Sequence, residues 1–172
     1  MTADLLELAF PARSKRRNLS DMPESDVSEA DLSGKGTVTR GVCLCGAVAF
    51  EVGGPLEPVV NCHCGQCRKM TGHYLASTNA SHEDFRFIRD GGLKWYHASD
   101  TARRGFCRDC GATLFWEQHG SGRIAIAAGS LEKAPGLTTA GHIFVADKAA
   151  YYDLEDGLPQ FAQDGEFKKM TD

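Results

Sequence analysis

Seven cysteines, gathered in three short clusters, restrict the structure of this 172-residue chain more strongly than its length or its composition. The clusters span positions 43–45, 62–67 and 107–110. Disulfides use cysteines in pairs, so an odd number leaves at least one sulfur for another purpose. Gly46 and Gly111 directly follow two of the clusters. A close cysteine pair followed by glycine is typical of a zinc knuckle, whose turn needs the positive φ that glycine adopts easily.

The seven sulfurs divide naturally into a group of four and a group of three. A structural zinc ion takes four ligands in a closed tetrahedron, whereas a catalytic zinc ion keeps three protein ligands and one open position. Only one such division keeps each local cluster whole. It predicts a structural zinc site at Cys43, Cys45, Cys107 and Cys110. It predicts an open, catalytic zinc site at Cys62, Cys64 and Cys67, and therefore two zinc ions per chain.

Three other uses of the cysteines remain open from the sequence. Two disulfides with spare thiols are disfavoured, because Asp4 and Glu7 stand where a secretory signal is basic, and we expect the protein in the reducing cytoplasm. An iron–sulfur cluster is the second alternative. The third is a redox dithiol formed by Cys64 and Cys67, although such a pair normally opens a helix in a β-α-β unit, which the sequence does not suggest.

The charge and hydropathy of the chain exclude two broad classes of partner. The formal net charge is −4 and the pI is about 5.9, which argues against general nucleic-acid binding, because that needs a basic face. The longest apolar runs, such as Ile124–Ala128, are only a few residues long. Nothing in the sequence is therefore expected to span a membrane.

The chain divides into an extension, one domain and a short tail. Residues 1–36 are rich in serine and charged residues, carry seven acidic and five basic side chains, and are predicted to be disordered. Residues 37–163 form the predicted folded domain, and residues 164–172 a C-terminal tail. The domain contains many short β-type segments with glycine-containing turns, which predicts a mainly β fold. The best short helical candidate is Asp147–Asp153.

The predicted strands follow one another at short intervals along the domain. Asp90-Gly91-Gly92 is a good turn between two of them. Their ranges are 47–52, 58–61, 74–79, 85–88, 93–97, 103–106, 112–117, 123–128 and 142–145.

The cysteine clusters and their neighbours resemble one known family. The segments are GVCLCG at 41–46, CHCGQCR at 62–68 and FCRDCG at 106–111, followed by AGSL at 128–131, HIF at 142–144 and GLPQF at 157–161. In order and spacing they are similar to the glutathione-dependent formaldehyde-activating enzymes, a family that includes centromere protein V. The resemblance implies a β-tent fold of small antiparallel sheets, and the same four-cysteine and three-cysteine zinc sites. Tyr151 is a departure, because many members have tryptophan nearby.

The resemblance also implies a function. It predicts a zinc-dependent carbon–sulfur lyase like S-(hydroxymethyl)glutathione synthase, with glutathione and formaldehyde as partners. We expect thiol activation at the open zinc, because three thiolates on Zn²⁺ make a weak Lewis acid. The alternatives are a lyase or detoxification enzyme acting on another thiol or electrophile, and a non-catalytic interaction module stabilised by zinc.

Other side chains near the clusters are candidates for supporting roles. We expect His63 to face solvent or to hydrogen-bond behind the ligands, with product protonation as the alternative, and His73 and His142 to be structural. Arg68, Lys69 and Arg104 are expected either to contact the carboxylates of glutathione or to be surface and screening charges. The predicted strands also carry aromatic residues that we expect in the core, with a pocket wall as the alternative. These are Phe85, Trp95, Tyr96, Phe115 and Trp116.

Overall fold

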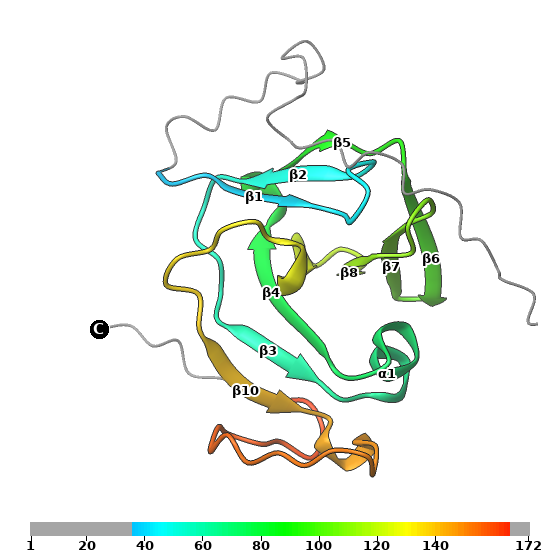
Figure 1. The fold of residues 1–172 in the computed structure, drawn as a ribbon, viewed down its shortest axis with the longest axis vertical. Helices are drawn as coiled ribbons and strands as arrows, with labels where there is room; N and C mark the ends of the chain where they lie inside the picture. The colour runs from blue at the N-terminus through cyan, green and yellow to red at the C-terminus, as the bar shows by residue number, and fades with distance from the viewer. Residues whose placement is uncertain (1–35, 166–172) are drawn as a thin grey trace, which may run out of the picture.

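The computed structural model describes residues 36–165, and it is a mainly β structure with two sheets. The predicted disorder of residues 1–36 and nearly all of the predicted tail lie outside the described residues. Within the described range the fold confirms the predicted class, since strands dominate and the single α-helix is short. Figure 1 shows the smaller sheet lying across one end of the larger one.

The smaller sheet has the order β1-β2-β5, and both of its pairs are antiparallel. Its strands are β1 (Thr39–Val42), β2 (Ala49–Val52) and β5 (Phe85–Arg89). All four residues of the central strand β2 are buried, including the carboxylate of Glu51. That carboxylate accepts hydrogen bonds from Arg40 at 2.7 Å and from Arg86 at 2.5 Å, which satisfies a charge that burial alone would destabilise.

The larger sheet has seven strands in the order β10-β3-β4-β9-β8-β7-β6. Their bounds are β3 (Val59–Cys62), β4 (Leu75–Ser81), β6 (Leu93–Ser99), β7 (Ala102–Cys107), β8 (Thr113–Gln118), β9 (Arg123–Ala127) and β10 (Thr139–Ile143). All pairs are antiparallel except β10 with β3, which is parallel. The sheet is therefore mixed, and the parallel pair places the last strand beside the segment that leads into the second cysteine cluster (Figure 1).

The only α-helix of the described residues, α1 (Gly65–Thr71), begins inside the second cysteine cluster. It starts after Cys64, whose Sγ accepts from the backbone N–H of Cys67 at 3.4 Å, and it ends at Gly72, which has a φ of 78°. Short 3₁₀ turns are η3 (His82–Asp84), η4 (Ala128–Ser130) and η5 (Val145–Asp147). None of the helices in the part of the chain that the structure describes is long and apolar enough to cross a membrane.

The helix predicted over Asp147–Asp153 is wrong. Only the end of η5 overlaps that segment. Upstream of it, the backbone N–H groups of Val145 and Ala146 donate to the carbonyls of Phe161 and Ala162. These bonds fix the path of the chain into the segment, and inside it Nζ of Lys148 donates to the carbonyls of Ala149 and Tyr152. Contacts outside a helical pattern thus override a weak local preference.

The main hydrophobic core lies where the smaller sheet meets the larger one. Phe50 on β2 and Phe115 on β8 are fully buried, with ring centroids 5.0 Å apart in an edge-to-face arrangement. Phe85 and Trp95 pack against this core, as predicted. Tyr96 does not, because its side chain is 59% exposed. The predicted core role of Tyr96 is therefore wrong: it follows Trp95 on β6, and successive strand residues point to opposite faces.

Candidate metal centres

The first and third cysteine clusters meet in space, although more than sixty positions separate them in sequence. Sγ of Cys45 lies 3.6 Å from Sγ of Cys43 and 3.7 Å from Sγ of Cys107. Together with Cys110, these sulfurs all lie within 4.8 Å of one another. A tetrahedral zinc ion with Zn–S bonds of about 2.3 Å needs sulfurs about 3.8 Å apart, so this four-cysteine group fits a closed zinc site.

Each half of the four-cysteine group is a tight turn that ends in glycine. In the first, Gly46 has a φ of 82° and donates its N–H to the carbonyl of Cys43. In the second, Gly111 has a φ of 73° and donates to the carbonyl of Cys107. Both glycines adopt the conformation that the sequence pattern predicts for zinc knuckles, in a φ range that a side chain would disfavour.

The turn that contains Gly92 contacts both of the cysteine-bearing turns of the four-cysteine group. The backbone of Gly92, between β5 and β6, donates to the carbonyl of Ala47 at 3.2 Å and accepts from the N–H of Arg108 at 2.8 Å. A Cβ at Gly92 would lie 2.7 Å from Cβ of Ala47 and 3.2 Å from a carboxylate oxygen of Asp109. Glycine is therefore needed here for close approach, a requirement that the sequence alone did not show.

The second cluster places its three sulfurs at the junction of β3 and α1. Cys62 ends β3, Cys64 caps the helix and Cys67 lies in its first turn. All three sulfurs lie within 4.8 Å of one another, and no fourth cysteine, histidine or carboxylate of residues 36–165 joins them. Cys67 is buried, whereas Cys62 and Cys64 are partly exposed. The structure thus brings the three predicted sulfurs together, and their role as an open, catalytic zinc site stays a prediction.

The sulfurs of the three-cysteine group compete for protons. Hydrogen bonds from the Cys62 thiol, and then from Cys64 and the Arg104 guanidinium, lower the pKa of Cys67 to about 6, although burial opposes the change. The pKa of Cys62 is raised by its hydrogen bond to Cys67 and by burial. One thiolate thus suppresses ionisation of its neighbour, because like charges repel. A divalent cation bound among the sulfurs would favour their thiolate forms, which is the property of a metal site.

The four-cysteine group shows the same competition. Burial, the largest effect, raises the pKa of Cys110, but hydrogen bonds from the backbone N–H groups of Ala112 and Cys45 outweigh it and bring the value to about 7. Burial also raises the pKa of Cys45 to about 12 and that of Cys107. Like the three-cysteine group, the four-cysteine group suits a soft divalent cation such as zinc. All seven cysteines are free of disulfides.

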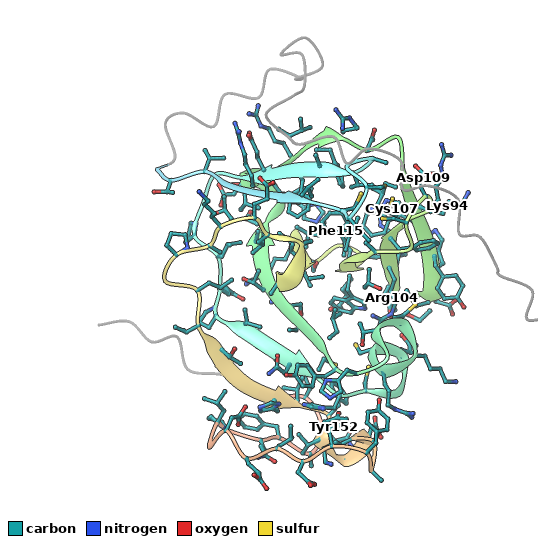
Figure 2. The ribbon with its side chains drawn as sticks, in the orientation of Figure 1. Lys94, Arg104, Cys107, Asp109, Phe115 and Tyr152 are labelled. Carbon is teal, nitrogen blue, oxygen red and sulfur yellow. The ribbon has the colours of Figure 1, made fainter. Side chains whose placement is uncertain are left out.

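Arg104 reaches the three-cysteine group from β7. Its Nη2 lies 3.6 Å from Sγ of Cys67, and its Nε and Nη2 donate to the side-chain carbonyl of Gln66 at 3.3 and 3.1 Å. Its side chain is buried, so the interpretation of Arg104 as a surface charge is wrong. Figure 2 shows Arg104 close to α1, while Cys107, on the same strand, lies towards the smaller sheet. Arg68 is half-buried and Lys69 is exposed.

A hydrogen-bonded chain of side chains lies behind the three-cysteine group. His63 is fully buried; its Nδ1 lies 2.5 Å from the hydroxyl of Tyr152, and its Nε2 lies 2.8 Å from Nδ1 of His142. Nε2 of His142 lies 2.8 Å from a carboxylate oxygen of Asp156. Because the carboxylate only accepts, His142 donates to Asp156, His63 donates to His142, and Tyr152 donates to His63.

This arrangement decides between the predicted roles of His63. It hydrogen-bonds behind the cysteines and does not face solvent. Burial, followed by the neighbouring His142 and His73, lowers the pKa of His63 to about 4. The ring of His73 packs against that of Tyr152, with centroids 4.1 Å apart and the ring planes tilted by 45°. Sequence reasoning missed the roles of three residues. Gln66 lies in the CHCGQCR segment, but its contact with Arg104 depends on the fold. Tyr152 and Asp156 carry no local motif and reach the site only through the fold.

The comparisons with known proteins agree with this geometry. The sequence model of a family described as glutathione-dependent formaldehyde-activating enzyme matches residues 38–147. The chain belongs to this family. The matched range contains all seven cysteines and ends before Tyr152 and Asp156. The predicted domain boundary at residue 163 therefore stays a prediction, although Phe161 still hydrogen-bonds to His142.

Two further comparisons concern solved structures and curated proteins. A crystal structure of a Rhodobacter sphaeroides protein matches with 27% sequence identity and a TM-score of 0.49, covering 60% of this chain and 98% of that chain. A comparison with curated proteins gave no match. Family membership thus rests on the family sequence model, and it associates the two cysteine groups with glutathione-dependent activation of formaldehyde at the level of the family.

Proposed function

We propose that this protein is a zinc-dependent carbon–sulfur lyase of the S-(hydroxymethyl)glutathione synthase type, with one structural and one catalytic zinc ion per chain. In the reaction, the sulfur of glutathione forms a bond to the carbon of formaldehyde, and the carbonyl becomes a hydroxyl. The proton lost by the thiol is balanced by the proton gained by that hydroxyl. The reducing cytoplasm, where cysteines stay free, is the compartment that suits this chemistry.

The observation that carries the proposal is the contrast between a complete and an incomplete set of sulfurs in one domain. Four sulfurs close a tetrahedron, whereas Cys62, Cys64 and Cys67 lack a fourth partner among the described residues. Structural zinc sites use four protein ligands, and catalytic sites leave one position for water or substrate. Membership of the glutathione-dependent family supplies the substrate class for that position.

The chain holds the three sulfurs in a fixed arrangement. The N–H of Cys67 donates to Sγ of Cys64, and Arg104 contacts Sγ of Cys67. Behind them, His63 is fixed between Tyr152 and His142, so the backbone that carries Cys62 and Cys64 is anchored at its central residue. A zinc ion held by these cysteines would supply an open position that lowers the pKa of a thiol. Neighbouring formaldehyde would then meet a sulfur already ionised and close by.

The test is to measure the exchange of formaldehyde between free and glutathione-bound forms by NMR, with and without the protein. This reaction also proceeds without an enzyme, so the expected result is a faster exchange rate at a fixed pH. Cys64→Ser should remove the acceleration while the protein stays folded. Met70→Leu, on the same helix at a position with no predicted contact to substrate, serves as the matched control for a general effect of altering α1 and should keep the acceleration.

The outcomes separate the alternatives. Acceleration that is lost in Cys64→Ser supports the proposal. Unchanged exchange with a folded, fully metallated protein contradicts it, and leaves another thiol or electrophile, or a binding role, to explain the open site. Metal analysis that finds iron, or one metal ion in place of two, contradicts the assignment of the two cysteine groups.

A further inference from the structure

Arg104 carries a positive charge into the interior without a carboxylate partner. It is 4% exposed on β7, and no aspartate or glutamate of the described residues forms an ion pair with it. Its neighbour Arg103, by contrast, pairs with Glu117 at 2.8 Å and lies over the ring of Trp95. Buried charges are expected to be paired, because an unpaired buried charge is strongly destabilising. Arg104 therefore needs an anion.

The partners that Arg104 does have indicate where that anion lies. The amide oxygen of Gln66 is neutral, so the only partner that can carry a negative charge is Cys67, at 3.6 Å. Three thiolates around one divalent cation have a net charge of −1, and the buried guanidinium brings this to zero. Without Arg104, an anionic ligand that enters the open position of the three-cysteine group would approach a centre that already has a net charge of −1. With Arg104, that repulsion is offset.

One donor of the guanidinium is still unused. Nη1 of Arg104 is buried and has no hydrogen-bond partner among the described residues. A buried donor without an acceptor is destabilising, and such groups in a folded protein need an explanation. In the four-cysteine group, Cys43 receives a bond from the backbone N–H of Val48 at 3.2 Å. The two buried side-chain nitrogens without a partner among the described residues, Nη1 of Arg104 and Nε of Arg68, both belong to arginines beside the three-cysteine group.

The geometry points to Arg104 as the residue that makes the three-cysteine site selective for an anionic ligand. Its guanidinium contacts the sulfur of Cys67, and its charge offsets the repulsion that an incoming thiolate would meet from the three cysteine thiolates. The inference rests on the proposed function only in treating the three cysteines as an open metal site. It goes beyond that function by naming the residue that decides which ligand charge is accepted.

The experiment compares a negative and a neutral ligand of the same open position. Protein loaded with Co²⁺ in place of zinc is titrated with 2-mercaptoethanol, which binds metals as a thiolate, and with imidazole, which binds as a neutral molecule. Changes in the visible absorption of the metal give both dissociation constants. In Arg104→Met we expect the affinity for the thiol to fall at least about tenfold, and the affinity for imidazole to change by less than about threefold.

The controls isolate the charge from the packing. Arg104→Lys keeps the charge but not the planar fork, so it should recover part of the preference for the thiol. Arg103→Met, one position away, should leave the ratio of the two affinities at its original value. If Arg104→Met does not fold, Arg104→Gln takes its place as the neutral variant. A ratio that is the same in the original protein and in the neutral variant overturns the inference.

The result is independent of catalysis. If the protein prefers the thiolate through Arg104 but does not accelerate the glutathione–formaldehyde reaction, the inference stands and the proposed function fails. If it accelerates the reaction with an unchanged affinity ratio, the proposed function stands and the inference fails.

Discussion

The four-cysteine and three-cysteine groups differ in the side chains that surround their sulfurs. Cys43 and Cys107 belong to the main hydrophobic core, where they pack with Phe50 and Phe115. Cys62, Cys64 and Cys67 lie outside that cluster, and their neighbours are the polar side chains of Arg104, Gln66 and His63. One group is thus part of the structure that holds the sheets together. The other is a polar site supported by that structure.

The largest effect that separates the two groups is expected from Cys107→Ser. The Cys107 side chain is fully buried and its sulfur joins segments on both sides of the core. Metal binding to such a site is part of the folding free energy, so we expect no stably folded domain. Far-UV circular dichroism and soluble yield measure this. A folded, soluble Cys107→Ser protein would show that the core does not depend on the four-cysteine group.

Cys64→Ser should have a smaller and different effect. Cys64 is partly exposed and lies outside the core, so we expect the domain to stay folded while the number of bound metal ions falls from two to one. Metal analysis and thermal unfolding of the same sample measure both properties. Equal loss of structure in this variant and in Cys107→Ser would contradict the proposal that the four-cysteine group is structural and the three-cysteine group is catalytic.

Gly92→Ala tests the contact between the two knuckles. The added Cβ would lie 2.7 Å from Cβ of Ala47, and overpacking of this kind costs about 1–3 kcal/mol. Gly91→Ala is the matched control, because a Cβ there meets nothing within 4 Å. Denaturant unfolding should therefore separate two neighbouring glycines. Equal stability of the two variants would show that the two cysteine-bearing turns can move apart without a loss of folding free energy.

The effect that is smallest at neutral pH is the contribution of His63, beside the three-cysteine group, to the pH dependence of stability. The pKa of His63 is lowered to about 4 in the folded protein, against about 6.5 for an unfolded histidine. The unfolded chain therefore binds more protons between these values, and the free energy of unfolding should fall as the pH drops from about 6.5 towards 4.

His63→Gln is the control for that pH dependence. It should show a shallower loss of stability over the same range, because glutamine does not titrate. Unfolding curves measured at several pH values give the comparison. Identical slopes for the two proteins would mean that His63 takes up a proton without loss of its hydrogen bonds.

The comparison also explains what the sequence could and could not predict. The grouping of the cysteines follows from local spacing, and the short strands follow from alternating patterns, so both were predicted. Arg104 was considered only as a charge next to a cluster, because its contact with Cys67 depends on how β7 approaches α1. The links from His63 to Tyr152 and Asp156 depend on the path of the chain after β10, and no motif in the sequence records that path.

The helix shows the same limit at shorter range. Its seven residues, Gly65–Thr71, begin inside the CGQC segment and are followed by Gly72, and the sequence indicates a helix there only as part of a redox dithiol. The strand before it pairs antiparallel with the strand after it, so the unit is not the β-α-β arrangement of such dithiols. Cys64 and Cys67 instead share their site with Cys62.

Strand β7 joins the two groups, because it carries Cys107 at one end and Arg104 within it (Figure 2). A shift of β7 caused by losing metal from the four-cysteine group would also move the guanidinium away from Cys67. Coupling of this kind is reciprocal: if one bound species strengthens the binding of another, the second strengthens the first by the same factor. An anion held at the open group would therefore strengthen the binding of metal at the closed one, so the ligand would help to preserve the protein that binds it.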